Sequence, residues 1–183
     1  MRRRSTLVSS TEGSALLEFA IALPLLVVFI VGIYDFSGAY NQRQKIEHAA
    51  QVGAIVAGGQ PTADMDSANP DSLQAPVVVI FNALTSDSVL PLANQGSCKP
   101  PVVPTPNGGL RWTYSITNCP DTLTIVIDRG VVDGGTPAIV GTAVSVTYPY
   151  HWRFNSAIQL LFPGATYAAT TNLTETASVH NQM

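Results

Sequence analysis

Charged residues are scarce in this sequence of 183 residues. Asp, Glu, Lys and Arg together make up 11% of the chain, less than half of the roughly 25% found in an ordinary soluble domain. The formal net charge is −3, and the one cluster of basic residues is a run of three arginines at positions 2–4. Binding to a nucleic-acid backbone needs a broad basic face. The sequence therefore argues against nucleic acid as a partner.

Cysteine and histidine are also rare. The two cysteines, Cys98 and Cys119, form no CxxC pair, and the three histidines are scattered. A structural zinc site takes four ligands at short spacings, and the acidic residues between positions 64 and 71 lack the ligand spacing of an EF-hand loop. We expect no metal and no cofactor. If this part of the chain lies outside the cytoplasm, a disulfide between Cys98 and Cys119 would stabilise it by about 3 kcal/mol.

The familiar sequence motifs of catalysis are missing as well. The nucleophile motif G-x-S-x-G does not occur, and no histidine lies close in sequence to a pair of carboxylates. The glycine-rich stretch 133–135 has none of the context of a phosphate-binding loop. We therefore expect a protein that is not an enzyme.

One long apolar run dominates the N-terminal part of the chain. It extends from Ser14 to Tyr34, and its single charged residue is Glu18. At about 1.5 Å per residue, a helix over this run is about 31 Å long, the thickness of the hydrocarbon core of a bilayer. The arginines at 2–4 precede the run and Asp35 follows it. The positive-inside rule then predicts a cytoplasmic N-terminus and an exported C-terminal part.

A cleaved secretory signal peptide is the main alternative for this run. Such a peptide has an apolar region of about 7–15 residues that ends in a small-residue cleavage site. The run here is longer, and it continues into the residues 33–36 without an A-x-A site. We expect the segment to be retained as a membrane anchor.

Glu18 is the most unusual residue of the run. An acidic side chain costs about 2.5–3.5 kcal/mol at the centre of a membrane helix, and less near the interface. A charge retained at that cost usually has a partner. The alternative is that Glu18 reaches back to water at the cytoplasmic surface.

The stretch from Gly13 to Ala57 resembles the N-terminal segment of the TadE-like family. The resemblance covers about a quarter of the chain. Its features are a glycine, a Glu-Phe pair five residues later, a proline, a long aliphatic run, an acidic-aromatic pair and an Ala-rich helix. Here these are Gly13, Glu18-Phe19, Pro24, Asp35-Phe36 and residues 44–57.

The resemblance, together with the similar cleavage site of type IV prepilins, implies a processed pilin-like protein. A prepilin peptidase would cut between Gly13 and Ser14, where a glycine can enter a peptidase cleft as extended backbone. Glu18, followed by Phe19, would pair with the N-terminal amine of its own or a neighbouring subunit and set the axial register. The implied partners are the peptidase, other pilin-like subunits of the tight-adherence system and the lipid bilayer. The implied location is a bacterial inner membrane, with the C-terminal domain in the periplasm or outside the cell.

Two further residues of this segment allow more than one interpretation. Pro24 removes a backbone hydrogen bond and can kink the helix, which either helps subunits to pack and be extracted or is simply tolerated. Asp35 lies eight residues before Arg43, too far for a local pair on one helix. We expect Asp35 to be solvated or to meet a partner on another chain.

The helix is expected to continue beyond the membrane to Ala57. Small apolar residues recur at spacings of three and four in this part, and they suit close packing against another helix or against the protein's own domain. Two glycines then end the helix. The predicted organisation is a leader at 1–13, a TadE-like transmembrane and amphipathic helix at 14–57, a linker at 58–76 and an exported α+β domain at 77–183.

The C-terminal part carries the alternating patterns of strands. Residues 111–117 and 122–128 alternate on either side of a turn, which predicts a hairpin, and 143–150 and 165–179 resemble further strands. Residues 77–81 fit either a strand or a short helix. The predicted fold is α+β, with a long N-terminal helix followed by a small antiparallel β-sheet of three or four strands.

Five aromatic residues fall near the strands: Trp112, Tyr114, Tyr148, Tyr150 and Trp152. At alternating positions they are expected to pack across strands rather than to form a binding platform.

Two functions fit these patterns. The first is a membrane-anchored pseudopilin or minor pilin-like subunit that acts in assembly of a tight-adherence, type IV-like pilus. The alternative is a signal-anchored envelope protein whose exported domain binds a ligand or a partner protein. Loss of the charge at Glu18 separates the two, because an assembly subunit needs that charge and a plain anchor does not.

Overall fold

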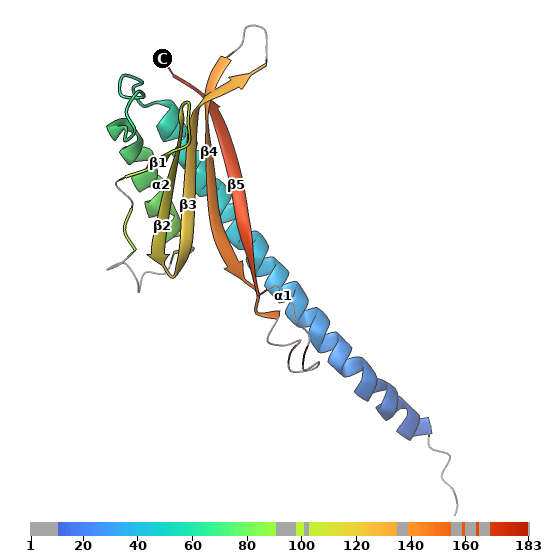
Figure 1. The fold of residues 1–183 in the computed structure, drawn as a ribbon. Coiled ribbons are helices and arrows are strands. Elements are labelled where there is room, and N and C mark those ends of the chain that lie inside the picture. The colour runs from blue at the N-terminus through green and yellow to red at the C-terminus, as the bar shows by residue number, and fades with distance from the viewer. Residues whose placement is uncertain are drawn as a thin grey trace, which may run out of the picture. The chain divides into compact units, whose positions relative to one another are not determined.

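The computed structural model describes residues 11–90, 98–100, 103–134, 139–154, 159, 164 and 169–182, and the side chains from residue 14 on with the exception of residue 133. The fold is α+β, as the sequence predicted. Its elements in chain order are α1 (Thr11–Gly58), the short 3-10 helix η1 (Asp71–Leu73), α2 (Gln74–Ser86), β1 (Thr105–Pro106), β2 (Arg111–Cys119), β3 (Asp121–Asp133), β4 (Ile139–His151) and β5 (Thr170–His180) (Figure 1).

Helix α1 is one continuous helix of 48 residues, about 72 Å long at 1.5 Å per residue. It contains the apolar run with Pro24 inside it, and it continues past the run to end at Gly58. The predicted end near the two glycines is confirmed.

The chain divides into two compact units. One consists of the described parts of Met1–Ser37 and Trp152–Ala169, and the other of Gly38–His151 and Thr170–Met183. Helix α1 runs through both. The connection between β4 and β5 therefore belongs to the same unit as the apolar half of α1.

The five strands form one antiparallel sheet in the order β1-β2-β3-β4-β5. The predicted hairpin is present as β2 and β3, which are joined by a tight turn at Pro120. The sheet has one strand more than the three or four predicted. The additional strand β1 is two residues long and pairs with Trp112 and Thr113, and two residues are too few to show an alternating pattern.

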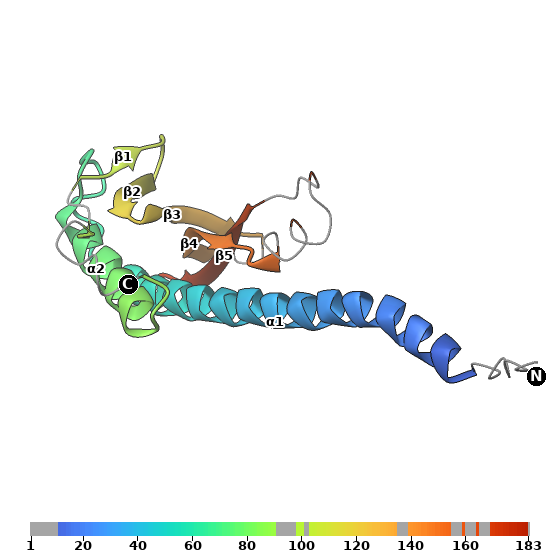
Figure 2. The same cartoon turned by 90° about the horizontal axis from the view of Figure 1, so that it is seen from below.

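One face of the sheet is buried and the other is exposed. The buried face carries fully buried side chains such as Ile125, Ile127, Val144 and Val146, and α2 and the part of α1 after Ser37 cover it (Figure 2). Hydroxyl side chains lie on the other face, where Thr147 and Thr174 approach to 2.9 Å between their Oγ1 atoms. The alternation read from the sequence thus corresponds to a core on one face.

The aromatic residues of the strands are core residues for the most part. Trp112, Tyr114 and Tyr148 are buried on the covered face, and Tyr150 and Trp152 are half-buried. Packing across strands, rather than a binding platform, accounts for the first three.

Residues 77–81 are helical, as part of α2. The four buried residues Val77, Ile80, Phe81 and Leu84 recur at the spacing of one helix face. Leu84 lies outside the segment 77–81, and the pattern of 77–81 alone fits a strand as well as a helix. For this reason the sequence did not decide between the two.

The small apolar residues of α1 pack against the protein's own domain. Ala50, Ala54 and Ala57 are fully buried. A Cβ atom added to Gly53 would overlap the side chain of Ile80 from α2 and lie 3.5 Å from Val144 of β4. Small side chains are therefore required here because α1 lies close to both α2 and the sheet.

Candidate functional site

The N-terminal half of α1 is the first candidate site. Among the described residues, α1 from Ser14 onward is the one helix long and apolar enough to cross a membrane, and no part of its most apolar stretch is buried by the protein. Leu16, Phe19 and Ile21 are all exposed by more than 60%. Such a surface is stable only where another apolar medium or another helix covers it.

Glu18 lies on this exposed half of α1. Ser14 precedes it by four residues, so the two residues share one face of the helix. No ion pair of Glu18 occurs within the described part of the chain. Gly13 and Ser14 both belong to α1, two and three residues after its first residue, and Pro24 is half-buried.

Asp35 is buried, with 1% of its surface exposed. Its Oδ2 atom accepts a hydrogen bond of 2.7 Å from the backbone N–H of Phe154. The expectation that Asp35 is solvated or paired with another chain is therefore wrong. The reason is tertiary: the chain after β4 returns to α1 from 119 residues away in sequence, and no local pattern indicates this.

Aromatic contacts accompany this hydrogen bond. The ring of Phe36 meets that of Trp152 edge to face, with 5.2 Å between the ring centroids. On the neighbouring face of the helix, a Cβ atom added to Gly32 would lie 3.8 Å from Cε2 of Phe154. Residues 32–36 of α1 thus hold the start of the β4–β5 connection at three points.

Polar contacts attach the half of α1 after Ser37 to strand β5 and to the end of α2. Arg43 forms a salt bridge with Glu175 of β5 and donates a hydrogen bond to its carboxylate. This hydrogen bond raises the pKa of Arg43. Lys45 donates a hydrogen bond of 2.7 Å to the carbonyl of Asp87. Arg43 is exposed, so the salt bridge contributes little to stability.

Cys98 and Cys119 are joined in a disulfide, with 4.7 Å between their Cα atoms. Both are buried. The carbonyl of Cys119 accepts a hydrogen bond of 2.8 Å from the hydroxyl of Tyr148 on β4. The disulfide and this hydrogen bond together hold the turn end of the β2–β3 hairpin.

A buried arginine fastens the segment after α1. Arg129 of β3 is 2% exposed and donates hydrogen bonds to the carbonyls of Gln60 (2.9 Å) and Pro61 (3.2 Å). Asp64 accepts hydrogen bonds of 2.8 Å from the N–H and from the hydroxyl of Ser72, which hold its pKa below the usual range. Part of the predicted linker 58–76 is thus fixed to the sheet.

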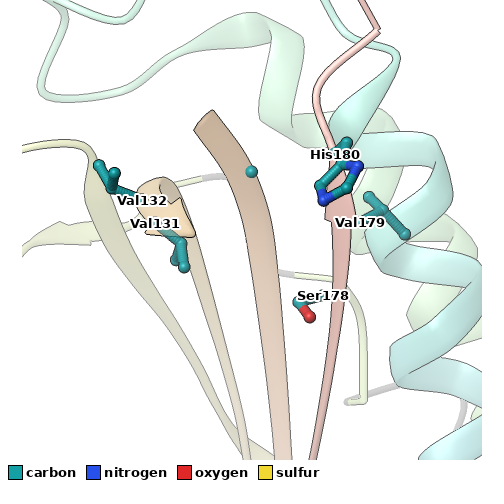
Figure 3. Close-up of a pocket in the computed structure, with 6 residues that line it drawn as sticks. Val131, Val132, Ser178, Val179 and His180 are labelled. Carbon is teal, nitrogen blue, oxygen red and sulfur yellow. The ribbon is translucent and has the colours of Figure 1, made fainter. Parts of the chain in front are cut away.

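The described residues contain no group of three His, Cys, Asp or Glu side chains that could hold a metal ion. They do contain an open pocket of about 590 Å³. Its lining is Val131, Val132, Gly141, Ser178, Val179 and His180. In Figure 3 Val131 and Val132 come from β3, and Ser178 and His180 from β5. Among the described residues of this lining, His180 is the one titratable side chain, and none of them offers it a carboxylate for acid–base chemistry.

Comparison with known proteins identifies the segment that holds the first candidate site. Residues 13–54 match the family model described as TadE-like protein. No curated protein and no solved structure matches the chain. The matched segment contains Gly13, Ser14, Glu18, Phe19, Pro24 and Asp35. The segment 13–54 of this protein is therefore similar to the TadE-like family, in agreement with the resemblance found in the sequence.

Proposed function

We propose that this protein is a membrane-anchored pseudopilin or minor pilin-like subunit that acts in assembly of a tight-adherence pilus, and that it has no catalytic activity. One observation carries the proposal. Glu18 is the single carboxylate of the run Ser14–Tyr34, it lies exposed on the apolar and uncovered half of α1, and this segment matches the TadE-like family model.

The proposed location is a bacterial inner membrane. The uncovered apolar half of α1 supports a membrane anchor, and the arginines at positions 2–4 support a cytoplasmic N-terminus. The rest of the chain then lies in the periplasm or outside the cell. The disulfide between Cys98 and Cys119 supports an oxidising compartment for that part.

The proposed processing step is a cut between Gly13 and Ser14 by a prepilin peptidase. Both residues lie close to the start of α1, and the ends of helices fray. A peptidase can therefore bind this part as extended backbone without unwinding the rest of the helix. The cut removes the arginines and leaves a positively charged α-amino group on Ser14.

That amino group gives Glu18 a partner, and the described part of the chain contains no ion pair of Glu18. One helical turn separates Ser14 from Glu18, so the amine can pair with Glu18 of its own chain or of a neighbour. The pair offsets the cost of the acid in lipid, which is about 2.5–3.5 kcal/mol at the helix centre. Because the Coulomb interaction falls off with distance, neighbouring helices bind best at one axial register.

The N-terminal sequence of the protein taken from cell membranes tests the processing step. In cells with an active prepilin peptidase we expect the mature chain to begin at Ser14. In cells without the peptidase we expect it to retain the leader. A mature chain that begins at any other residue contradicts the proposal.

Substitution of Glu18 tests the assembly role. Glu18→Ala should insert into the membrane at least as well as the native chain, because it removes a charge from lipid, but it should not support pilus formation. Glu47→Ala is the matched control, since Glu47 is an exposed carboxylate in the exported half of the same helix. Normal pili with Glu18→Ala would favour the alternative, a signal-anchored envelope protein whose exported domain binds a ligand or partner.

A further inference from the structure

Aromatic side chains gather where α1 leaves its apolar run. Tyr34 and Phe36 are each exposed by more than 60%. The two residues are two positions apart and point to different sides of α1. Large aromatic rings exposed at the end of an uncovered apolar run indicate a surface that another medium covers.

The β4–β5 connection adds Trp152 and Phe154 to this region. Trp152 packs edge to face on Phe36, and Phe154 lies against Gly32 and donates its N–H to Asp35. All of these residues belong to one compact unit of the structure, so their relative positions are defined. Arg153, between the two aromatic residues, is exposed.

These contacts lie at the end of α1's apolar run, where a membrane-spanning helix would leave the hydrocarbon core. Gly32 lies inside the apolar run Ser14–Tyr34, so Phe154 reaches the level at which that run ends. From Gly32 to Phe36 the helix rises about 6 Å. The headgroup region on one side of a bilayer is about 5–8 Å deep, and a tilted helix crosses it over a slightly longer distance.

We propose that Tyr34, Phe36 and Trp152, together called the aromatic collar, lie in the headgroup region of the phospholipid bilayer. The exported part of the protein then has a second contact with lipid, through the start of the β4–β5 connection. The proposal rests on the proposed anchoring of α1 in the membrane, and it adds a contact that the TadE-like segment does not contain.

The chemistry of the collar fits phospholipid headgroups. Tyrosine and tryptophan prefer the membrane interface because their rings are apolar and their O–H or N–H groups are polar. Arg153 can extend its guanidinium to lipid phosphates. Asp35 is the one acid among residues 32–36 and 152–154, and its carboxylate is buried by the protein, where it accepts a hydrogen bond from Phe154. The sequence 155–169, which follows, contains no charged residue.

The two tryptophans of the chain allow a direct test with the full-length protein in phosphatidylcholine vesicles. Trp112 is 2% exposed in the core of the sheet, so brominated lipids should not quench it. Bromine near the headgroup end of the acyl chains should quench part of the emission of the native protein, and bromine near the chain ends should quench less. Trp152→Phe, which leaves Trp112 as the one tryptophan, should lose this quenching.

A third variant separates the collar from the anchor. Val27→Trp, made in the Trp152→Phe protein, places a tryptophan in the middle of the apolar run and should be quenched most by deep bromine. If Val27→Trp is quenched but the native Trp152 is not, the collar does not contact lipid although α1 spans the bilayer, and the proposal is overturned. If neither is quenched, the anchoring itself is wrong.

Dilution of the protein in the vesicles identifies the partner. Quenching of Trp152 that persists at low ratios of protein to lipid supports contact with lipid. Quenching that is absent at low ratios and appears only after the chains associate means that the single chain does not bring Trp152 to lipid, and it contradicts the proposal.

Discussion

At the scale of single residues, two buried tyrosines show that the contribution of a hydroxyl group to stability depends on whether it has a hydrogen-bond partner. Tyr148 donates a hydrogen bond to the carbonyl of Cys119, whereas the hydroxyl of Tyr114 is buried without a hydrogen-bond partner in the described part of the chain. Burial raises the pKa of Tyr114 to about 12, and it raises the pKa of Tyr148 as well. Both hydroxyls therefore stay protonated at neutral pH.

We expect Tyr114→Phe and Tyr148→Phe to change stability in opposite directions. Tyr114→Phe removes an unpaired polar group and should raise the free energy of unfolding by about 1 kcal/mol. Tyr148→Phe removes the hydrogen bond to the carbonyl of Cys119 and should lower the free energy of unfolding by about 1 kcal/mol. Thermal unfolding of the full chain in detergent micelles, followed by circular dichroism, measures both. Equal losses in the two variants would show that Tyr114 has a partner after all.

Asp64 should make stability depend on pH in the acid range. Its hydrogen bonds to Ser72 hold its pKa below the value of about 3.9 in an unfolded chain. The folded state therefore binds fewer protons, and the contribution of Asp64 is complete above about pH 4 and is lost as the pH falls through the folded pKa. Unfolding midpoints measured between about pH 2 and 5 should fall less steeply for Asp64→Asn than for the native chain.

The nearby Asp66 provides the control for that measurement. It is exposed, and Asp66→Asn should leave the pH dependence unchanged. If Asp64→Asn and Asp66→Asn have the same acid profile as the native chain, the hydrogen bonds of Asp64 do not stabilise the fold.

At the scale of elements, α1 combines two surfaces on one helix. Its N-terminal half is apolar and uncovered, whereas its C-terminal half is buried along a stripe of small residues. The stripe is narrow because α2 and the sheet approach the helix backbone closely. At Gly53 the space for even one methyl group is taken by Ile80.

We expect Gly53→Ala to destabilise the exported part by about 1–3 kcal/mol, because the added methyl group forces Ile80 and its neighbours to move. Gly59→Ala is the matched control, since a Cβ atom there would lie 3.7 Å from the nearest atoms, an ordinary contact. Thermal unfolding in detergent should separate the two variants. Equal stability would mean that α1 and α2 are farther apart than the structure shows.

At the scale of the whole molecule, the disulfide stabilises the fold only in an oxidising compartment of the cell. Cys98 and Cys119 are 21 residues apart, and closing a loop of that length stabilises a fold by about 3 kcal/mol on the chain-entropy model. Such a bond persists in the periplasm or outside the cell and not in the cytoplasm.

The redox state of the two cysteines in cells therefore tests the proposed topology. After rapid alkylation in denaturant, the membrane-inserted native chain should react with a maleimide reagent only once it has been reduced. Cys98→Ser should react without reduction, because it leaves Cys119 without its partner. Native chains that react fully before reduction would place the exported part in a reducing compartment.

The sequence by itself determined the features that depend on local composition and spacing. The run Ser14–Tyr34 indicates a membrane-length helix because hydropathy and length suffice for that, and the pair Gly13 and Glu18 indicates the TadE-like segment because both lie in one short motif. The hairpin of β2 and β3 follows from alternation around a single turn. These inferences need no contact between distant residues.

Only the tertiary structure decided the features that depend on distant contacts. Asp35 is buried because Phe154 comes back to α1, the small residues of α1 face α2 and β4 rather than another chain, and residues 77–81 are helical because Leu84 completes the buried face of α2. The strand β1 exists because β2 offers it an edge. For Asp35 and the small residues of α1, the deciding contacts come from partners far away in sequence, which no local pattern contains. For α2 and β1 the partners are nearer, but they lie outside the short segment whose pattern could be read.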